Sequence, residues 1–183
     1  MTKPINIALG ALVVLCIFFM INQRSQKSHS ITGNAIYVGD SNSVFRVVLS
    51  EGEKEIELIR TDSTWKISNA DTLIIKDNQI DKIFNRILTV EQEMLISSKS
   101  EKWEKFGVDD SLGRHIQVFN EKNQELLHYI FGNSGSDFQH NYVREVNSSD
   151  IYRTNNNIFF LLNTDATYWG EIPPKPRSEQ TEN

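Results

Sequence analysis

The chain has 183 residues, a formal net charge of −5 and one cysteine, Cys16. An acidic chain lacks the basic footprint with which proteins bind nucleic acid, and its mixed signs form no basic stripe for anionic lipid. Cys16 lies near the N-terminus. The rest of the chain therefore holds no disulfide framework, no cysteine-ligated zinc and no catalytic thiol.

Residues 4–23 are uncharged and mostly apolar, between Lys3 and the cations Arg24 and Lys27. Twenty helical residues rise by about 30 Å, the thickness of a hydrocarbon core. Residues 1–24 are therefore predicted to be an N-terminal transmembrane helix that anchors the chain. The apolar side chains assigned to this anchor are Ile5, Leu9, Leu12, Val13, Leu15, Ile17, Phe18, Phe19 and Ile21.

Two other interpretations of this segment fit less well. A cleaved signal peptide needs small residues directly after its apolar core, and here that core runs into Asn22 and Gln23. A buried core helix would have a polar face, which residues 5–21 lack. Cations flank the segment on both sides, so the positive-inside rule gives little orientation. Because most of the chain follows the anchor, we expect that part to be exported.

Composition divides the remaining chain. Residues 25–42 are polar and rich in Ser, Gly and Asn, which predicts a tether. Residues 43–170 are long enough for one domain with its own core, with 43–97 and 98–170 as candidate sub-modules. Residues 171–183 are rich in Pro and charge, which predicts a disordered tail.

The domain opens with a period-two pattern. Residues on one face recur at every second position in 44–49, 55–59 and 65–67, and turn residues fill 50–53 and 61–63. In 44–49, Phe45, Val47 and Leu49 alternate with Val44, Arg46 and Val48. This pattern predicts a three-strand antiparallel meander with one apolar face.

A helix should follow and cover that face. Asp77 is suited to be its N-cap, and apolar residues recur at helical spacing at Ile80, Ile83, Phe84, Ile87 and Leu88.

The next segment predicts a strand and a short helix. Met94 and Ile96 suggest the strand. The spacing of Ser98 and Glu101 fits a capping box, and Gly107 is a typical residue just past a helix end.

A second block repeats the theme. Strands are predicted at 116–118 and 125–131 around a turn at 121–124, with the longer strand central because it is apolar on both faces. Residues 142–146 should pair with 151–153. A short helix is predicted from the apolar residues Ile158, Phe159, Leu161 and Leu162. Tyr168 and Trp169 are expected to close the fold. The fold class is therefore α+β, with antiparallel β-meander modules each covered by a helix.

The sequence contains no nucleophile elbow, zincin motif, phosphate loop or dinucleotide fingerprint. No catalytic residue, metal ion or cofactor is therefore assigned. His128 alternates with Leu126 and Ile130, which indicates a partly buried, hydrogen-bonded histidine.

One loop gathers polar residues that could contact a ligand or partner: Gly132, Gly135, Asp137, His140, Tyr142 and Arg144. The two glycines are interpreted as loop positions with positive φ. Asp137 and His140 could orient a base, and Ser134 or Ser136 could act as a nucleophile. A solvated hairpin loop with a polar rim explains the same residues more simply.

Several segments resemble the bacterial envelope family called domain of unknown function 4340. The most specific is Lys102 to Ser111, KWEKFGVDDS, and the similarity runs from about Phe45 to the closing Tyr168-Trp169. The resemblance implies a single N-terminal span and an association with ABC transport systems of the gliding-motility type. It implies no catalytic residue. This chain is short, with one copy of the domain where longer relatives carry more.

The sequence thus favours a non-enzymatic accessory subunit that docks on a membrane protein complex, with an ABC transporter permease as the candidate partner and no nucleic acid. Its expected location is the bacterial inner membrane, with most of the chain periplasmic. The alternatives are an envelope ligand-binding module for a sugar, peptidoglycan fragment or anion, and an envelope hydrolase.

Overall fold

The computed structural model describes residues 12–15, 31–62 and 64–174. Residues 12–15 are helical and exposed, so Leu12, Val13 and Leu15 of the predicted anchor are described. The anchor's other assigned residues lie outside the described residues. Within the described part of the chain, no helix has the length and apolar composition needed to cross a membrane.

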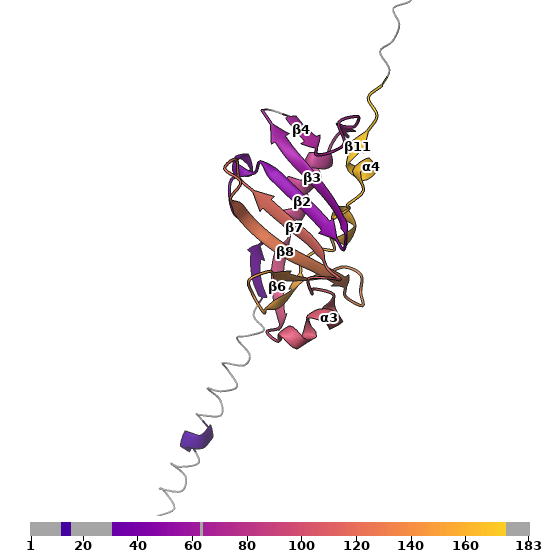
Figure 1. Cartoon of the computed structure of the whole chain (residues 1–183). Coiled ribbons are helices and arrows are strands. Elements are labelled where there is room, and N and C mark those ends of the chain that lie inside the picture. The colour runs from indigo at the N-terminus through magenta and orange to yellow at the C-terminus, as the bar shows by residue number, and fades with distance from the viewer. Residues whose placement is uncertain (1–11, 16–30, 63, 175–183) are drawn as a thin grey trace, which may run out of the picture.

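Nine strands form one antiparallel sheet in the order β1-β6-β10-β9-β8-β7-β2-β3-β4 (Figure 1). In chain order they are β1 (Ile31–Ala35), β2 (Arg46–Glu51), β3 (Lys54–Thr61), β4 (Thr64–Ile67), β6 (Glu91–Ser97), β7 (Arg114–Phe119), β8 (Glu125–Ser134), β9 (Asn141–Glu145) and β10 (Ile151–Thr154). A second, two-stranded sheet pairs β5 (Ile74–Ile75) with β11 (Gly170–Glu171).

The helical segments are short. They are η1 (Ser41–Ser43), α2 (Gln79–Lys82), the π-helical turn η2 (Ile83–Ile87), η3 (Ser100–Lys102), α3 (Trp103–Phe106), η4 (Phe159–Leu161) and α4 (Ala166–Trp169). The α+β class is confirmed in its coarse form, as a mostly antiparallel sheet with few helices.

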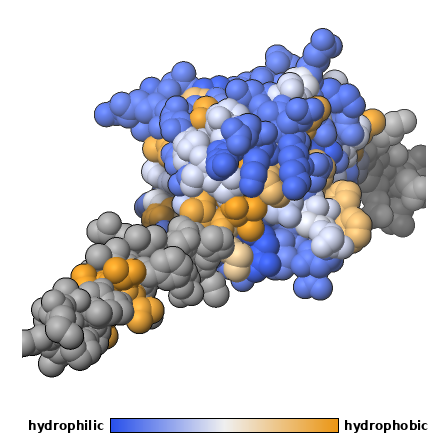
Figure 2. Space-filling model, turned by 90° about the horizontal axis from the view of Figure 1, so that it is seen from below, coloured by the Kyte–Doolittle hydropathy of each residue, from blue (hydrophilic) through white to orange (hydrophobic). Residues whose placement is uncertain are grey.

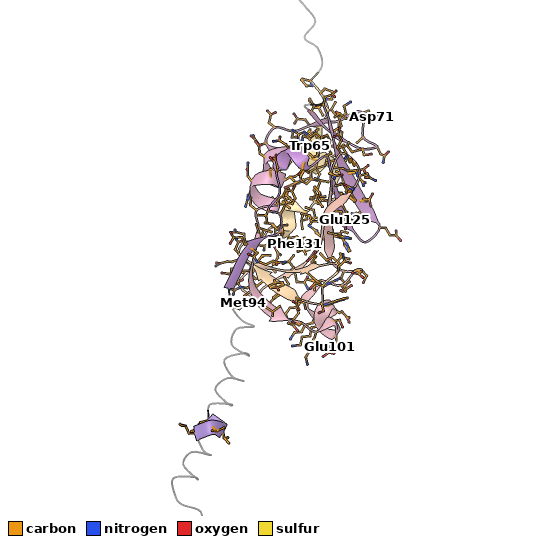
Figure 3. The ribbon with its side chains drawn as sticks, turned by 90° about the vertical axis from the view of Figure 1, so that its left-hand side faces the viewer. Trp65, Asp71, Met94, Glu101, Glu125 and Phe131 are labelled. Carbon is orange, nitrogen blue, oxygen red and sulfur yellow. The ribbon has the colours of Figure 1, made fainter. Side chains whose placement is uncertain are left out.

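The main core lies on one face of the sheet. Alternate residues of β2, β3 and β7 point into it, and α2 with η2 covers it, as the period-two and helical patterns predict. Its fully buried members include Leu49, Ile83, Ile116 and Trp169. Phe131, on the central strand β8, lies in the middle of the domain (Figure 3).

A smaller core lies on the opposite face. Val108, Ile130 and Ile151 are buried there beneath α3, which packs Trp103 and Phe106 onto them. Figure 1 shows α3 at the lower end of the sheet. Both faces of β8 are thus covered, which confirms its predicted central position.

The predicted arrangement of two modules, each with its own covering helix, is wrong. β2 pairs with β7, and β6 pairs with β10, so strands from residues 43–97 and 98–170 join in one sheet. The described helical segments of the second half are the short η3, α3, η4 and α4, and α3 covers the opposite face of the shared sheet instead of a separate module. Period-two patterns show which side chains are buried, but they do not show which distant strand lies alongside.

The sheet also begins earlier than the sequence predicts. β1, within the segment 25–42 assigned to a tether, pairs with β6, and Ile36 after it is 6% exposed. This strand has few apolar residues, so its composition resembles that of a linker.

Two predicted helix caps are also corrected. The N-cap of α2 is Asn78, at φ 63°, and not Asp77. The N-cap of η3 is Lys99, without a side-chain capping bond, so Ser98 forms no capping box there. Gly107 does end α3, at φ 66°, as predicted.

Candidate functional site

The predicted polar loop connects β8 to β9 and is closed by its own hydrogen bonds. Gly135 N donates to His140 O at 3.1 Å, and Phe138 N donates to Gly135 O at 3.0 Å. The positive φ in this loop belongs to Phe138, at 57°, and to neither Gly132 nor Gly135, which corrects the prediction. Phe138 is 75% exposed, and Asn157 Nδ2 donates to its carbonyl oxygen at 2.9 Å.

The structure brings together Asp137 and His140, which the sequence offered as one candidate pair. His140 Nε2 lies 3.4 Å from Asp137 Oδ2, and His140 Nδ1 lies 2.7 Å from Thr154 O. A carbonyl oxygen only accepts, so Nδ1 carries the proton of that bond. Among the described residues, no hydrogen bond joins Ser134 or Ser136 to His140. The pair is therefore an oriented imidazole without an adjacent hydroxyl nucleophile.

Tyr142 and Arg144 pack against α3, and the Tyr142 hydroxyl also lies close to Gly135 of the loop. The Tyr142 ring packs on Phe106 with centroids 4.5 Å apart. The Arg144 side chain is 1% exposed and lies 3.7 Å from the centroid of the Trp103 ring. The Arg144–Trp103 pair belongs to the smaller core, so the loop does not present Arg144, the cation that the sequence assigned to it.

Three hydrogen bonds occupy the Arg144 guanidinium. Its Nε donates to Val108 O at 2.9 Å, one terminal nitrogen donates to Val146 O at 3.0 Å, and the other donates to Asp110 Oδ1 at 2.6 Å. Arg144 thus fixes the segment after α3 against β9.

Asn141 is a buried polar residue that the sequence did not single out. Its Oδ1 accepts from Ile158 N at 2.7 Å and from Phe159 N at 3.2 Å, and its Nδ2 donates to Gly132 O at 3.3 Å. Asn141 therefore ties η4 and β8 to β9, and it is a positioning residue for the polar loop.

A histidine pair lies on β7 and β8, on the face of the smaller core. His128 Nε2 and His115 Nδ1 are 3.0 Å apart, and His115 Nε2 is 3.2 Å from Asp110 O. Gln117 Nε2 lies 3.4 Å from His128 Nδ1. These partners are all satisfied when each neutral ring carries its proton on Nε2.

Burial lowers the pKa of His128, and the neighbouring His115 lowers it further. The prediction of a partly buried, hydrogen-bonded histidine at this position is confirmed. In the part of the chain that the structure describes, no group of three or more His, Cys, Asp or Glu side chains is placed to hold a metal ion.

A mostly apolar concavity lies at the other end of the domain and was not predicted from the sequence. We call it the edge groove. It has a volume of about 710 Å³ and is lined by Thr64, Trp65, Lys66, Ile67, Ala70, Asp71, Leu73, Ile74, Ile75 and Ile80. These residues come from β4, the turn after it, β5 and α2. Figure 3 shows Trp65 and Asp71 at the end of the domain away from Glu101.

Exposed apolar surface gathers at this groove. Ile74 is 46% exposed, and Trp65 is half-buried, with its ring edge-on to Phe84 at 6.0 Å between centroids. By comparison, the face of the domain seen from below in Figure 2 is mostly polar, with a small apolar group near its centre. Exposed apolar concavities of this kind are typical of binding sites.

A family model described as "Domain of unknown function (DUF4340)" matches residues 65–171 of the chain. The match begins at β4, so β2 and β3 precede it. It contains the edge groove and the polar loop. A search of curated proteins gives no match, and neither does a search of solved structures. Because the matched segment covers more than half of the sequence, the chain belongs to the DUF4340 family.

Proposed function

We propose that this chain is a non-enzymatic accessory subunit that docks on a membrane protein complex. In this proposal, the N-terminal span anchors it in the bacterial inner membrane, and the domain lies on the periplasmic side. The candidate partner is an ABC transporter permease.

The edge groove carries this proposal. An apolar groove of about 710 Å³ beside the last strand of a sheet suits a polypeptide better than a small polar substrate. The lining side chains are mainly aliphatic or aromatic, and none is a histidine, cysteine or serine.

The polar loop supports the two alternatives less well. An anion-binding module would need a free cation there, but Arg144 is buried against Trp103 and Asp110. A serine hydrolase would need a hydroxyl beside His140, whereas the described contacts of His140 are to Asp137, Thr154 and Glu93.

The test is purification of the full chain, tagged after Asn183, in several mild detergents. We expect a membrane protein to co-elute in fixed stoichiometry through size exclusion and to be identified by mass spectrometry. A chain truncated after residue 42 keeps the predicted anchor without the domain and serves as the matched control. A monomer in every detergent, or equal recovery of the partner by the truncated chain, would contradict the proposal.

A further inference from the structure

We infer that the edge groove binds an extended segment of its partner, which adds a strand to β4. The segment carries apolar side chains at alternate positions and basic side chains next to them. This inference rests on the proposed docking function and names the chemistry of the docked segment.

The backbone of β4 is open on its outer side. β4 ends the sheet order. Ser68 N donates to Glu57 O at 2.8 Å, so alternate residues of this segment bond to β3 and the intervening residues, Trp65 and Ile67, turn their backbone groups outward. Ile67 O accepts from Ala70 N at 3.4 Å. The N–H and C=O of Trp65 have no hydrogen-bond partner among the described residues, which leaves a donor and an acceptor for an added strand.

The groove lies where side chains of such a strand would fall. Residues paired across antiparallel strands point to the same face of the sheet, so partners of Trp65 and Ile67 would share their face. On that face Leu73, Ile75 and Ile80 pack against the main core and also line the groove. Alternate residues of a strand are about 6.8 Å apart, so a strand matching the four residues of β4 places two side chains in the groove.

The charge next to the groove favours a basic segment. Asp71 lines the groove, and Asp77 and Asp81 lie in the segment around Ile80, another lining residue. All three are exposed and have no ion-pair partner among the described residues. The ammonium groups of Lys76 and Lys82 keep their charge but are held against residues outside the groove lining, since Lys76 Nζ donates to Thr167 O at 2.5 Å and Lys82 Nζ donates to Gln79 Oε1 at 3.1 Å. Lys66 is the one cation among the lining residues. Lys or Arg beside the apolar positions of the partner would complement this surface.

The first experiment tests strand addition with a defined probe. A synthetic peptide of alternating Val and Lys, seven residues long, is titrated onto the full chain in detergent, and a Val/Glu peptide is the charge control. We expect the Val/Lys peptide to bind at least about tenfold more tightly, and to slow hydrogen exchange of the Trp65 amide. Two N-methylated isomers of the peptide test which of its two backbone edges pairs with β4. Methylation of the edge facing β4 should abolish binding, and methylation of the other edge should leave it intact.

Equal binding of the two isomers, or unchanged exchange at Trp65, would overturn the inference. Equal binding of the Val/Glu peptide would overturn its charge component.

The second experiment uses the co-purified complex. Ile74→Lys and Asp71→Lys should each reduce recovery of the partner by about tenfold, because each removes apolar contact or attraction and adds a cation. The matched controls are Val38→Lys, at a residue 90% exposed, and Glu53→Lys, in the exposed β2–β3 turn. If the partner co-purifies undiminished with the two groove variants, the inference is overturned while the proposed function stands. If no partner co-purifies with the unaltered chain, the proposed function itself fails.

Discussion

At Gly132, the backbone of β8 runs directly against the end of α3. A Cβ atom there would overlap the carbonyl oxygen of Phe106 and lie 2.8 Å from the carbonyl carbon of Gly107. The need for glycine is therefore a close approach between two backbones, because φ at this position is not positive.

Gly132→Ala should accordingly destabilise the domain by about 1–3 kcal/mol, the usual cost of overpacking. Gly135→Ala, in the loop directly after β8, is the matched control, since its nearest atom would be Asp137 Oδ1 at 3.4 Å. The control should change stability by less than about 0.5 kcal/mol. Chemical unfolding of the full chain in detergent, followed by circular dichroism, measures both. Equal effects of the two substitutions would contradict the close-approach argument.

His128 should make stability depend on pH. Its pKa is lowered in the folded chain, so below its ordinary pKa near 6.5 the unfolded chain binds a proton that the folded chain does not. The free energy of unfolding should therefore fall as pH drops from about 7 to 5, and be regained as pH rises. His128→Asn should reduce this slope. The measurement is chemical unfolding at several pH values, and identical slopes for the variant and the unaltered chain would exclude this role of His128.

Residue spacing in the sequence suggested the Asp137–His140 pair but not the His115–His128 pair. Asp137 and His140 are three residues apart on one connection, so the sequence suggested them as a candidate pair, and their side chains lie 3.4 Å apart. His115 and His128 are thirteen residues apart and meet because Gln117 lies opposite His128 across β7 and β8. The register of β7 with β8 is set by pairing along the whole of both strands, so the sequence around either histidine does not reveal it.

At the scale of elements, Arg144 is one of the links between α3 and the sheet, beside the packing of Trp103 and Phe106 on the smaller core. Its guanidinium is stacked on Trp103 and hydrogen-bonded to Val108 O and Val146 O, while Asp110 supplies a carboxylate. A planar, five-donor group suits this combination of stacking and forked bonding, and an ammonium group does not.

Arg144→Met should therefore destabilise the domain by about 3 kcal/mol or more, because it leaves buried carbonyl oxygens without donors. Arg144→Lys should recover less than half of that loss. Arg153→Met is the control, since Arg153 is 33% exposed and its ion pair with Glu93 should contribute less than about 1 kcal/mol. Thermal and chemical unfolding compare the variants. If Arg144→Met proved as mild as Arg153→Met, Arg144 would not be a link between α3 and the sheet.

Elements with a strong local pattern were predictable. The strands from β2 to β4 and the α2–η2 helix follow from period-two and period-3.6 spacing, because both report burial of one face. β1 was assigned to a tether since Ile31–Ala35, read ITGNA, is stabilised by pairing with β6 and not by its own composition.

The edge groove was missed for a related reason. Its apolar residues have the same spacing as core residues, and only the packing of β5 and α2 shows which of them remain exposed. Ile67 is 3% exposed, whereas Ile74 is 46% exposed. The sequence alone treats the two as equivalent.

At the scale of the whole molecule, the proposed function assigns folding to the domain and membrane location to the N-terminal segment. Deletion of Met1 to Gln23 should leave a folded domain, because the described cores use only residues from Ile36 onward. The unfolding midpoint of the released domain should match that of the full chain within about 2 °C, a shift smaller than most single core substitutions cause. The deleted chain should leave the membrane fraction and lose its partner. Persistence in that fraction after a carbonate wash would contradict the anchor prediction.

β1 and β4 are the two outer strands of the same nine-stranded sheet. Eight strand spacings separate them, roughly 38 Å along the sheet. If the chain is held at the membrane through β1 and at a partner through β4, a force between membrane and partner acts on the hydrogen bonds that join each strand to the next. The ladder of β1 with β6 contains a register break between Ile31 and Asn34. Register breaks also occur in the β10–β6, β8–β9 and β7–β8 ladders, whereas the β2–β7, β2–β3 and β3–β4 ladders have none. The irregular ladders thus lie on the tether side of the sheet, so a pulled domain should yield on that side before it releases its partner.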